Sequence, residues 1–458
     1  MSSPQRNLPP RPRVGIQQLI QPGPPGHGIR IPDPEGREEG KFSLQTNRRK
    51  FLLQGASALV GTSVAWPSAN RASSIFFTKG PSKKVLILGA GMSGLVAGYE
   101  LTKLGHDVTI LEARKRPGGR VHTLREPFSD GLYAEEGAAR IPENHDLTLK
   151  YVNLFELSLE PMYPSRLSAL RFDTGQRREV PIEGFTEGVR QFFGLDLSGN
   201  PERWYKIKGG ADLLPAAIAR KLAGKIHYDA AVVRIEQDAK GTRAVFIENG
   251  RRQTFAADRI LSTIPFSVLR DIELPSNFPE RRKRMIRTTQ YDAVSRVFLQ
   301  MKTRAWEQTG LNGFALTEDR VEIWHPTWNL PGPRGILMTY ARPGQAEVID
   351  RMRESDRITT TLAQLESIFP GVRKSFEAGA SKCWAEDQWS RGAWAFVGFR
   401  DLNPSLQPED RIHFAGEHLS TAFSWMQGAI WSALQAVQQI DEAPVMHARL
   451  QVTASSAC

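Results

Sequence analysis

Three glycines and one acidic residue have the types and spacing that suit a dinucleotide. Gly89, Gly91 and Gly94 form a GxGxxG motif, and Glu112 follows the last glycine by 18 residues. A pyrophosphate needs nearby backbone N–H groups and the positive end of a helix dipole, so we expect a Cβ at any of these glycines to hold the ligand away. Glu112 can accept a hydrogen bond from a ribose hydroxyl. The residues expected to bind are Gly89, Gly91, Met92, Ser93, Gly94 and Glu112, although a tight turn without ligand is an alternative for the motif alone.

The surrounding residues predict the strands and the helix that would position this motif. Residues 85–88 form an apolar run of strand length directly before the glycines. Small and apolar residues at 94, 97, 98 and 101 recur at helical spacing, so a helix can pack closely against a sheet. Gly105 ends that helix, and residues 108–111 predict a second buried strand that finishes at Glu112. This order of elements predicts a Rossmann-type unit.

A second glycine turn, flanked by arginines, follows the acidic residue. Residues 112–120 read EARKRPGGR, which suits further phosphate and a flat ring close to the backbone. The segment resembles the flavin-containing amine oxidases, in which a GGR segment follows the FAD-binding unit. The resemblance covers most of residues 83–440 and implies FAD, because a nicotinamide enzyme would not need this segment. It adds Ala113, Arg114, Gly119 and Arg120 to the cofactor site.

Residues 131–142 resemble the segment that follows the flavin site in L-amino-acid oxidases and tryptophan monooxygenases. The resemblance implies that Arg140 holds a substrate carboxylate and that Ala138, Ala139 and Arg140 line the cofactor site. A planar guanidinium can grip a carboxylate with two parallel hydrogen bonds. The alternative is a surface ion pair of Arg140 with Glu135 or Glu136.

Two further positions resemble substrate-facing residues of the family. Arg296 stands where these oxidases usually have a lysine that holds a water at flavin N5, and an arginine cannot relay a proton in the same way. Trp324 stands where the family has an aromatic residue facing the substrate, although a core tryptophan beside a surface His325 is equally expected.

Three other segments complete the implied flavin site. Val233 matches a position whose backbone meets the adenine end of FAD, and plain strand core is the alternative. In residues 382–394, Trp384 matches a tryptophan that lies against the isoalloxazine ring, and Trp389 matches a nearby aromatic residue. Ala393 stands in the place of the cysteine that bonds the flavin covalently in monoamine oxidases. Non-covalent FAD is therefore expected. In residues 411–429 the resemblance implies that FAD contacts Gly416, Glu417, Trp425 and Met426. Glu417 would bind the ribityl chain of FAD, and Trp425 would form a wall beside the substrate. The start of the following helix would face the flavin ring.

At 458 residues the chain exceeds what one core usually encloses, so more than one domain is expected. The expected fold class is α/β, with a Rossmann-type FAD-binding domain, a mixed-sheet substrate domain and a helical insert shorter than in the family. The sequence predicts one helix near 147–157 in the insert, a β-hairpin across Asn249 and Gly250, and further strands over 291–300 and 335–340. The expected parts are a disordered leader with a twin-arginine signal (1–73), an FAD-binding domain in three pieces (83–140, 204–270 and 381–445), the shortened insert (141–203), the substrate domain (271–380) and a tail (446–458).

The charge and the leader bear on location and partners. Residues 1–73 carry a net charge of +6 out of +11 for the chain, so a nucleic-acid partner is not expected. Arg48, Arg49 and the apolar stretch that ends near Trp66 resemble a twin-arginine signal, which predicts a periplasmic or extracellular protein. An uncleaved amphipathic arm is the alternative. We expect no stable membrane span, no metal site and no disulfide framework, and the sequence leaves a homodimer open.

These patterns together predict an FAD-dependent L-amino-acid oxidase. Its substrates would be an amino acid or amine and molecular oxygen, and its products a 2-oxo acid, ammonia and hydrogen peroxide. The alternatives are an amine or polyamine oxidase, an FAD-dependent desaturase, or a flavoprotein without catalysis because the insert is short.

Overall fold

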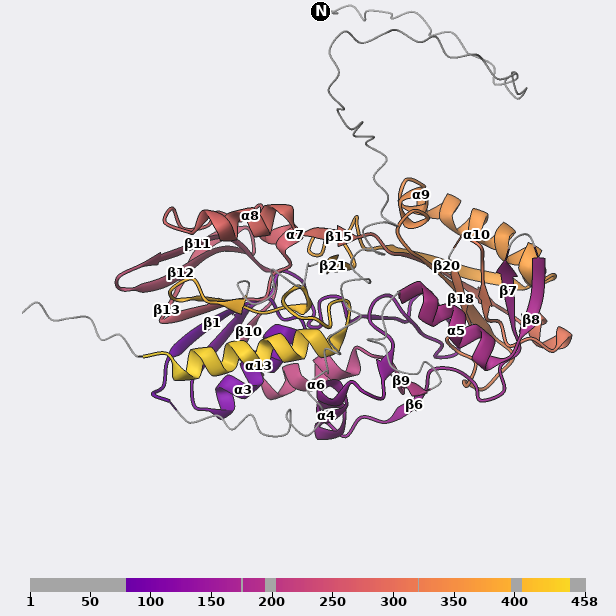
Figure 1. The fold of residues 1–458 in the computed structure, drawn as a ribbon, viewed down its shortest axis with the longest axis horizontal. Helices are drawn as coiled ribbons and strands as arrows, with labels where there is room; N and C mark the ends of the chain where they lie inside the picture. The colour runs from indigo at the N-terminus through magenta and orange to yellow at the C-terminus, as the bar shows by residue number, and fades with distance from the viewer. Residues whose placement is uncertain (1–79, 174–175, 194–202, 320, 397–405, 445–458) are drawn as a thin grey trace, which may run out of the picture. The chain divides into compact units, whose positions relative to one another are not determined.

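The computed structural model describes residues 80–173, 176–193, 203–319, 321–396 and 406–444. These residues all belong to one compact unit, 67–458, drawn in Figure 1. The expected leader and tail, including Arg48 and Arg49 of the expected twin-arginine signal, lie outside the described residues. No helix within the described ranges is both long and apolar enough to cross a membrane.

A parallel sheet forms the centre of the cofactor-binding part (Figure 1). Its strand order is β10 (Ile226–His227), β2 (Asp107–Leu111), β1 (Lys84–Leu88), β14 (Arg259–Ser262) and β22 (Ile412–Phe414). The apolar runs predict strands buried on both faces, as parallel strands are. The predicted strands at 85–88 and 108–111 are confirmed.

Successive side chains of β1 point to opposite faces of this sheet, and different elements pack on each face. Val85 and Ile87 pack against helices α3 (Met92–Lys103), α6 (Leu213–Lys221) and α13 (Met426–Glu442). Leu86 and Leu88 pack on the other face, toward the antiparallel strands β11 (Ala230–Asp238), β12 (Gly241–Glu248) and β13 (Arg251–Ala257). The period of two along one strand therefore builds a three-layered core.

The hairpin predicted across residues 249–250 is confirmed. Asn249 and Gly250 join β12 to β13 with φ of 50° and 72°. Positive φ at both central residues suits the right-handed twist of the flanking strands, which explains why this residue pair occurs here.

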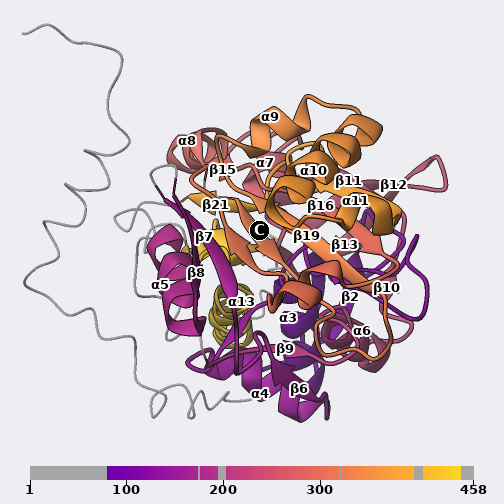
Figure 2. The same ribbon diagram turned by 90° about the vertical axis from the view of Figure 1, so that its right-hand side faces the viewer.

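A mixed sheet forms the substrate part. Its strand order is β20 (Phe376–Cys383), β16 (Ser295–Met301), β19 (Gly335–Ala341), β18 (Glu322–Trp324), β17 (Ala315–Leu316), β7 (Ala169–Asp173) and β8 (Gln176–Val180). Val297 and Leu299 of β16 pack toward helix α10 (Glu354–Ile368), whereas Phe298 packs in the same cluster as Phe185 of helix α5 (Ile182–Phe193). Figure 2 shows α10 and α5 apart on the two sides of these strands. The sheet is thus covered on both faces.

The insert contains more regular secondary structure than the sequence predicts. The helix expected near 147–157 is present as α4 (Asp146–Leu154), but α5 is a second helix that the analysis missed, and β7 and β8 extend the substrate sheet. Gly184 and Gly188 lower the helix propensity of residues 182–193, so the sequence does not indicate helix α5. In the structure a Cβ at Gly188 would lie 2.4 Å from Leu316, so this glycine permits close packing of the helix on the sheet.

Other short elements connect these layers. The run predicted as one strand over 291–300 is divided into β15 (Gln290–Asp292) and β16, because β15 pairs instead with β21 (Trp394–Phe396). The remaining elements are β3 (Thr123–Leu124), β4 (Ala134–Glu135), β5 (Ile141–Pro142), β6 (Leu159–Pro161), β9 (Trp204–Ile207), α7 (Phe266–Leu269), α8 (Glu280–Thr288), η3 (Ala305–Thr309), α9 (Ala346–Asp350), α11 (Val372–Ser375) and η5 (Glu417–Leu419).

The close approach of α3 to the glycine turn gives a matched pair of variants. A Cβ at Gly94 would lie 1.9 Å from the carbonyl oxygen of Gly89, whereas a Cβ at Gly91 meets no atom within 4 Å, and Gly91 has a φ of −72° that alanine accepts. We expect Gly94→Ala to lower the free energy of unfolding by about 3 kcal/mol or more, and Gly91→Ala to change it by less than about 1 kcal/mol. Thermal unfolding of the two apoproteins checks this, and equal losses would contradict it.

Candidate cofactor and substrate site

A large cavity runs along the carboxyl ends of the parallel strands and into the substrate part. Its empty space is about 1570 Å³, including space open to solvent. Ligands of open α/β sheets bind at these strand ends. The cavity is lined by the glycine turn, the GGR segment, strands β16 and β19, and the start of α13.

The three motif glycines have different roles. Gly91 has open space where a Cβ would lie, so a ligand can approach its backbone as expected. Gly89 has a φ of 104°, which favours glycine, and a Cβ there would meet the Thr263 hydroxyl at 2.7 Å. Gly94 does not line the cavity, and its missing side chain instead lets α3 begin against the turn. Of the three glycines, Gly91 is the one at which a Cβ would point into open space rather than against protein atoms.

Glu112 lies at the carboxyl end of β2, where the sequence predicts an acid for a ribose. Its carboxylate accepts hydrogen bonds from the backbone N–H of Ala90 at 2.7 Å and of Arg114 at 2.8 Å. Burial raises the pKa of Glu112, although both hydrogen bonds favour the charged form. The carboxylate is therefore fixed in orientation at the wall of the cavity.

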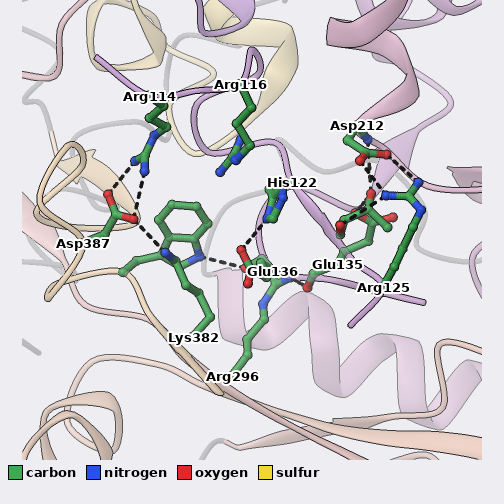
Figure 3. Close-up of polar contacts among 12 residues, drawn as sticks. Arg114, Arg116, His122, Arg125, Glu135, Glu136, Asp212, Arg296, Lys382 and Asp387 are labelled. Carbon is green, nitrogen blue, oxygen red and sulfur yellow. Dashed lines mark hydrogen bonds and ion pairs between the residues drawn. The ribbon is translucent and has the colours of Figure 1, made fainter. Parts of the chain in front are cut away.

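Arg114 lines the cavity, but Asp387 holds its guanidinium (Figure 3). Two guanidinium nitrogens bond the two carboxylate oxygens at 3.2 and 2.5 Å, and Lys382 Nζ donates to the same carboxylate at 2.7 Å. Burial alone would raise the pKa of Asp387, yet these donors hold it well below its usual value. This cluster fixes residues 382–390 beside the GGR segment.

Glu417 is fixed by three donors near the start of α13. Its carboxylate accepts hydrogen bonds from Arg120 Nη1 at 2.8 Å and from the N–H groups of Ala395 and Ser424 at 3.2 and 3.0 Å. Helix α13 begins at Met426, and no side chain caps it. Its amino end therefore presents backbone N–H groups and a partial positive charge at the cavity wall.

The aromatic residues of the 382–394 segment also line the cavity. The indole Nε1 of Trp384 donates to the Glu136 carbonyl at 2.7 Å, which restrains the orientation of the ring. Trp389, Ala393 and Trp394 lie in the same wall, and Ala393 offers no nucleophile for a covalent flavin bond.

Most of the residues expected from the sequence line the cavity, but Val233 and Gly94 do not. Val233 lies in a β-bulge between Val232 and Arg234, and its carbonyl accepts a hydrogen bond from the N–H of Glu273 at 3.1 Å. Val232 lines the cavity instead. The bulge shifts the register by one residue, and sequence alone does not reveal it.

Arg140 lies in a buried, aromatic end of the cavity rather than at the surface. It forms an ion pair with Glu322, not with either of the two neighbouring glutamates that the sequence suggested. Its guanidinium carbon lies over the rings of Trp324, Trp204 and Tyr340, at 4.1, 5.1 and 5.6 Å from their centroids. The cation is thus held by one carboxylate and several ring faces.

Glu322 is a site residue that the sequence analysis missed. It is fully buried, and it accepts hydrogen bonds from Arg342 at 2.6 Å and from the indole of Trp324 at 3.0 Å, in addition to Arg140. Burial would raise the pKa of Glu322, but the two arginines hold it below its usual value, so the carboxylate is ionised. The available signal was a glutamate inside an otherwise apolar strand.

Arg296 and Trp425 complete the walls of this end. Arg296 Nη1 donates to the Glu135 carbonyl at 2.5 Å, and its guanidinium lies 4.6 Å from the ring centroid of Tyr340. Trp425 makes edge contacts with the rings of His145 and Trp204 at 4.8 and 5.8 Å. The structure therefore brings together the four residues that the sequence analysis expected to act on a substrate, namely Arg140, Arg296, Trp324 and Trp425.

The chemistry of these residues fits FAD. Gly91 leaves room for a phosphate, Glu112 and Glu417 present fixed carboxylates for hydroxyl groups, and the uncapped start of α13 can face an electron-rich ring edge. Nowhere in the described residues do three or more His, Cys, Asp or Glu side chains gather as metal ligands would.

Comparisons with known proteins agree with this geometry. Residues 92–193 and 180–441 match the model of the flavin containing amine oxidoreductases. YobN of Bacillus subtilis (strain 168), which carries the name of an L-amino-acid oxidase, is 30% identical, with 79% of this chain and 95% of that protein covered. The flavin-dependent L-tryptophan oxidase RebO of Lentzea aerocolonigenes is 27% identical, with 78% and 98% covered.

Solved structures with the same fold come from amine oxidases. Putrescine oxidase bound to putrescine superposes with a TM-score of 0.67 at 18% identity, covering 79% of this chain and 99% of that one. Cyclohexylamine oxidase from Brevibacterium oxydans IH-35A superposes with a TM-score of 0.66 at 17% identity, covering 79% and 98%. At this identity the likeness concerns the fold.

The Glu135 carboxyl gives a pH-dependent prediction. Burial raises its pKa from 4.5 to about 7, although the N–H of Ala211 and the hydroxyl of Thr123 donate to it. The folded state therefore keeps a proton that the unfolded chain releases, and stability falls as the pH rises from 4.5 to about 7. We expect Glu135→Gln to match the wild type below pH 4.5 and to be more stable above pH 7, by at most about 3 kcal/mol. Denaturant unfolding across this range measures it, and parallel curves would contradict it.

Proposed function

The chain belongs to the flavin-containing amine oxidoreductase family and is an FAD-dependent enzyme acting on amine donors, and we propose that its substrates are L-amino acids. The reaction would remove two electrons and two protons from the Cα–NH₂ group, and water would hydrolyse the imino acid to a 2-oxo acid and ammonia. Molecular oxygen would take the two electrons and two protons and leave as hydrogen peroxide.

The observation that carries this proposal is the charge of the aromatic end of the cavity. Two guanidinium groups, those of Arg140 and Arg296, line it, and Arg342 stands behind them. Glu322 forms ion pairs with Arg140 and Arg342, so one carboxylate is shared between two guanidinium groups. A net positive, largely dry site stabilises an anionic group, which an amino acid has and a simple amine lacks.

Arg140 is the residue proposed to hold the substrate carboxylate. Glu322 and the ring faces fix its guanidinium in place, so little side-chain entropy would be lost when a carboxylate binds. Two-point contact with a planar guanidinium would orient the Cα–H bond. Bound FAD supplies the hydride acceptor, and the protein's contribution is orientation, exclusion of water and electrostatics.

The aromatic side chains of the cavity are proposed to assist the same hydride transfer from Cα. Trp324 and Tyr340 stack at 5.4 Å with an angle of 12° between their planes, and Trp425 forms another wall. These rings exclude water around the reacting carbon and strengthen the contact between carboxylate and guanidinium. The start of α13 places a partial positive charge at the cavity wall, where it favours negative charge that builds up during the reaction.

Amine or polyamine oxidation is the second candidate, and the fold likeness to putrescine oxidase favours testing it. A diamine carries a second ammonium, which would need an acidic partner. Glu322 already accepts hydrogen bonds from two arginines and one tryptophan, and it does not line the cavity. The charge balance therefore disfavours a diamine.

The proposal predicts peroxide release from L-amino acids and not from amines. Peroxide is measured with the FAD-loaded enzyme over the twenty amino acids and a set of mono- and polyamines. We expect turnover of at least one L-amino acid and none of the D-enantiomer of that amino acid. Turnover of amines alone would show that the arginine-lined end does not select a carboxylate.

Replacing Arg140 tests the carboxylate contact directly. We expect Arg140→Met to raise the apparent KM for the amino acid by about 100-fold, because one partner of a buried charge pair is lost, and to lower kcat less. Arg334→Met is the matched control, since Arg334 is a partly exposed arginine that pairs with Glu377 and Asp130 outside the cavity. Retained flavin absorbance would show that both variants fold. An unchanged KM in Arg140→Met would refute the contact.

A further inference from the structure

The buried cation Arg296 lacks a carboxylate partner. It is 6% exposed and lines the cavity, and among the described residues its guanidinium makes no ion pair with an acidic side chain. Its hydrogen bond at 2.5 Å goes to the carbonyl oxygen of Glu135, and it also interacts with the Tyr340 hydroxyl. Its Nε has no hydrogen-bond partner in the described part of the chain. A buried guanidinium in this state is costly unless an anion joins it.

The other charged groups nearby do not supply that anion. Arg140 adds a second positive charge, and the Glu322 carboxylate is bound to Arg140, Arg342 and Trp324. The Glu135 side chain accepts from the Ala211 N–H and the Thr123 hydroxyl and makes no ion pair with Arg296. Glu135 is therefore occupied by other donors.

Arg140 and Arg296 lie close enough together to act on one small molecule. Their guanidinium carbons are 4.1 and 5.5 Å from the centroid of the same Trp324 ring, so their separation is less than the sum of these distances. Both also lie near the Tyr340 ring, at 5.6 and 4.6 Å from its centroid. Two carboxylates joined by a short carbon chain can span such a separation.

We infer that the enzyme prefers L-amino acids with a carboxylate side chain, and that Arg296 binds this second carboxylate while Arg140 binds the first. The inference rests on the proposed function, because it assigns the side chain of the same substrate. A dicarboxylic amino acid with a neutral amine brings two negative charges to Arg140 and Arg296 at the aromatic end of the cavity, whereas its amide analogue brings one. Arg296 is then a specificity-determining residue.

The first test compares each acidic amino acid with its amide. We expect kcat/KM for L-glutamate or L-aspartate to exceed that for L-glutamine or L-asparagine by about 100-fold, because the amide leaves the buried Arg296 charge without an anion. Equal or higher kcat/KM for the amides, with amino-acid turnover retained, would overturn the inference and leave the proposed function intact. No turnover of any amino acid would refute the proposed function itself.

The second test uses variants of Arg296 and does not depend on turnover. Isothermal titration calorimetry of the FAD-loaded protein compares glutarate, with two carboxylates, and glutaramate, in which one is an amide. We expect the wild type to bind glutarate about 100-fold more tightly, Arg296→Gln to lose most of that ratio and Arg296→Lys to keep part of it. A ratio that survives in Arg296→Gln would place the second carboxylate elsewhere and overturn the assignment. Equal changes in both ligands would indicate a merely structural role and also contradict it.

Discussion

The buried carboxylate of Glu322 is the interaction on which the substrate end of the molecule depends. It comes from a short strand of the substrate sheet and binds Arg140, which ends the first cofactor-binding segment of the chain. The same carboxylate holds Arg342 and the indole of Trp324. Removing this carboxylate would take an ion-pair partner from two largely buried arginines, which is a severe cost in free energy. One ionised group therefore fixes the position of a cation, an aromatic wall and the contact between two parts of the fold.

Elements with strong local signals were predictable from the sequence. Strand β1 and helix α3 were found because apolar runs, small residues at helical spacing and the glycine motif all indicate the same unit. The hairpin at Asn249 and Gly250 was found because these residues accept positive φ. Helix α5 was missed because Gly184 and Gly188 are weak helix formers, and their packing against the substrate sheet is a tertiary effect.

Site residues that belong to a sequence motif were predictable. Site residues that depend on contacts with distant parts of the chain were not. The cavity lining includes the expected glycines 89 and 91, Glu112, Glu417 and the arginines at 140 and 296. The partner of Arg140 lies 182 residues further along the chain, and no sequence spacing indicates such a pair. Val232 rather than Val233 lines the cavity, because a β-bulge shifts the register there and a bulge is invisible in the sequence. Site residues at the ends of local elements can thus be predicted from the sequence. The ion pairs between residues far apart in the chain can be found only from the folded structure.

The central claim is that a carboxylate on the substrate is required by the arginine-lined cavity. Its most direct test is an anaerobic titration of the FAD-loaded protein with the L-amino acid of fastest turnover and with the amine that differs only by loss of the α-carboxylate. We expect the amino acid to bleach the flavin absorbance in a single turnover and the amine to leave it unchanged at the same concentration. Bleaching by the amine at a comparable rate would contradict it.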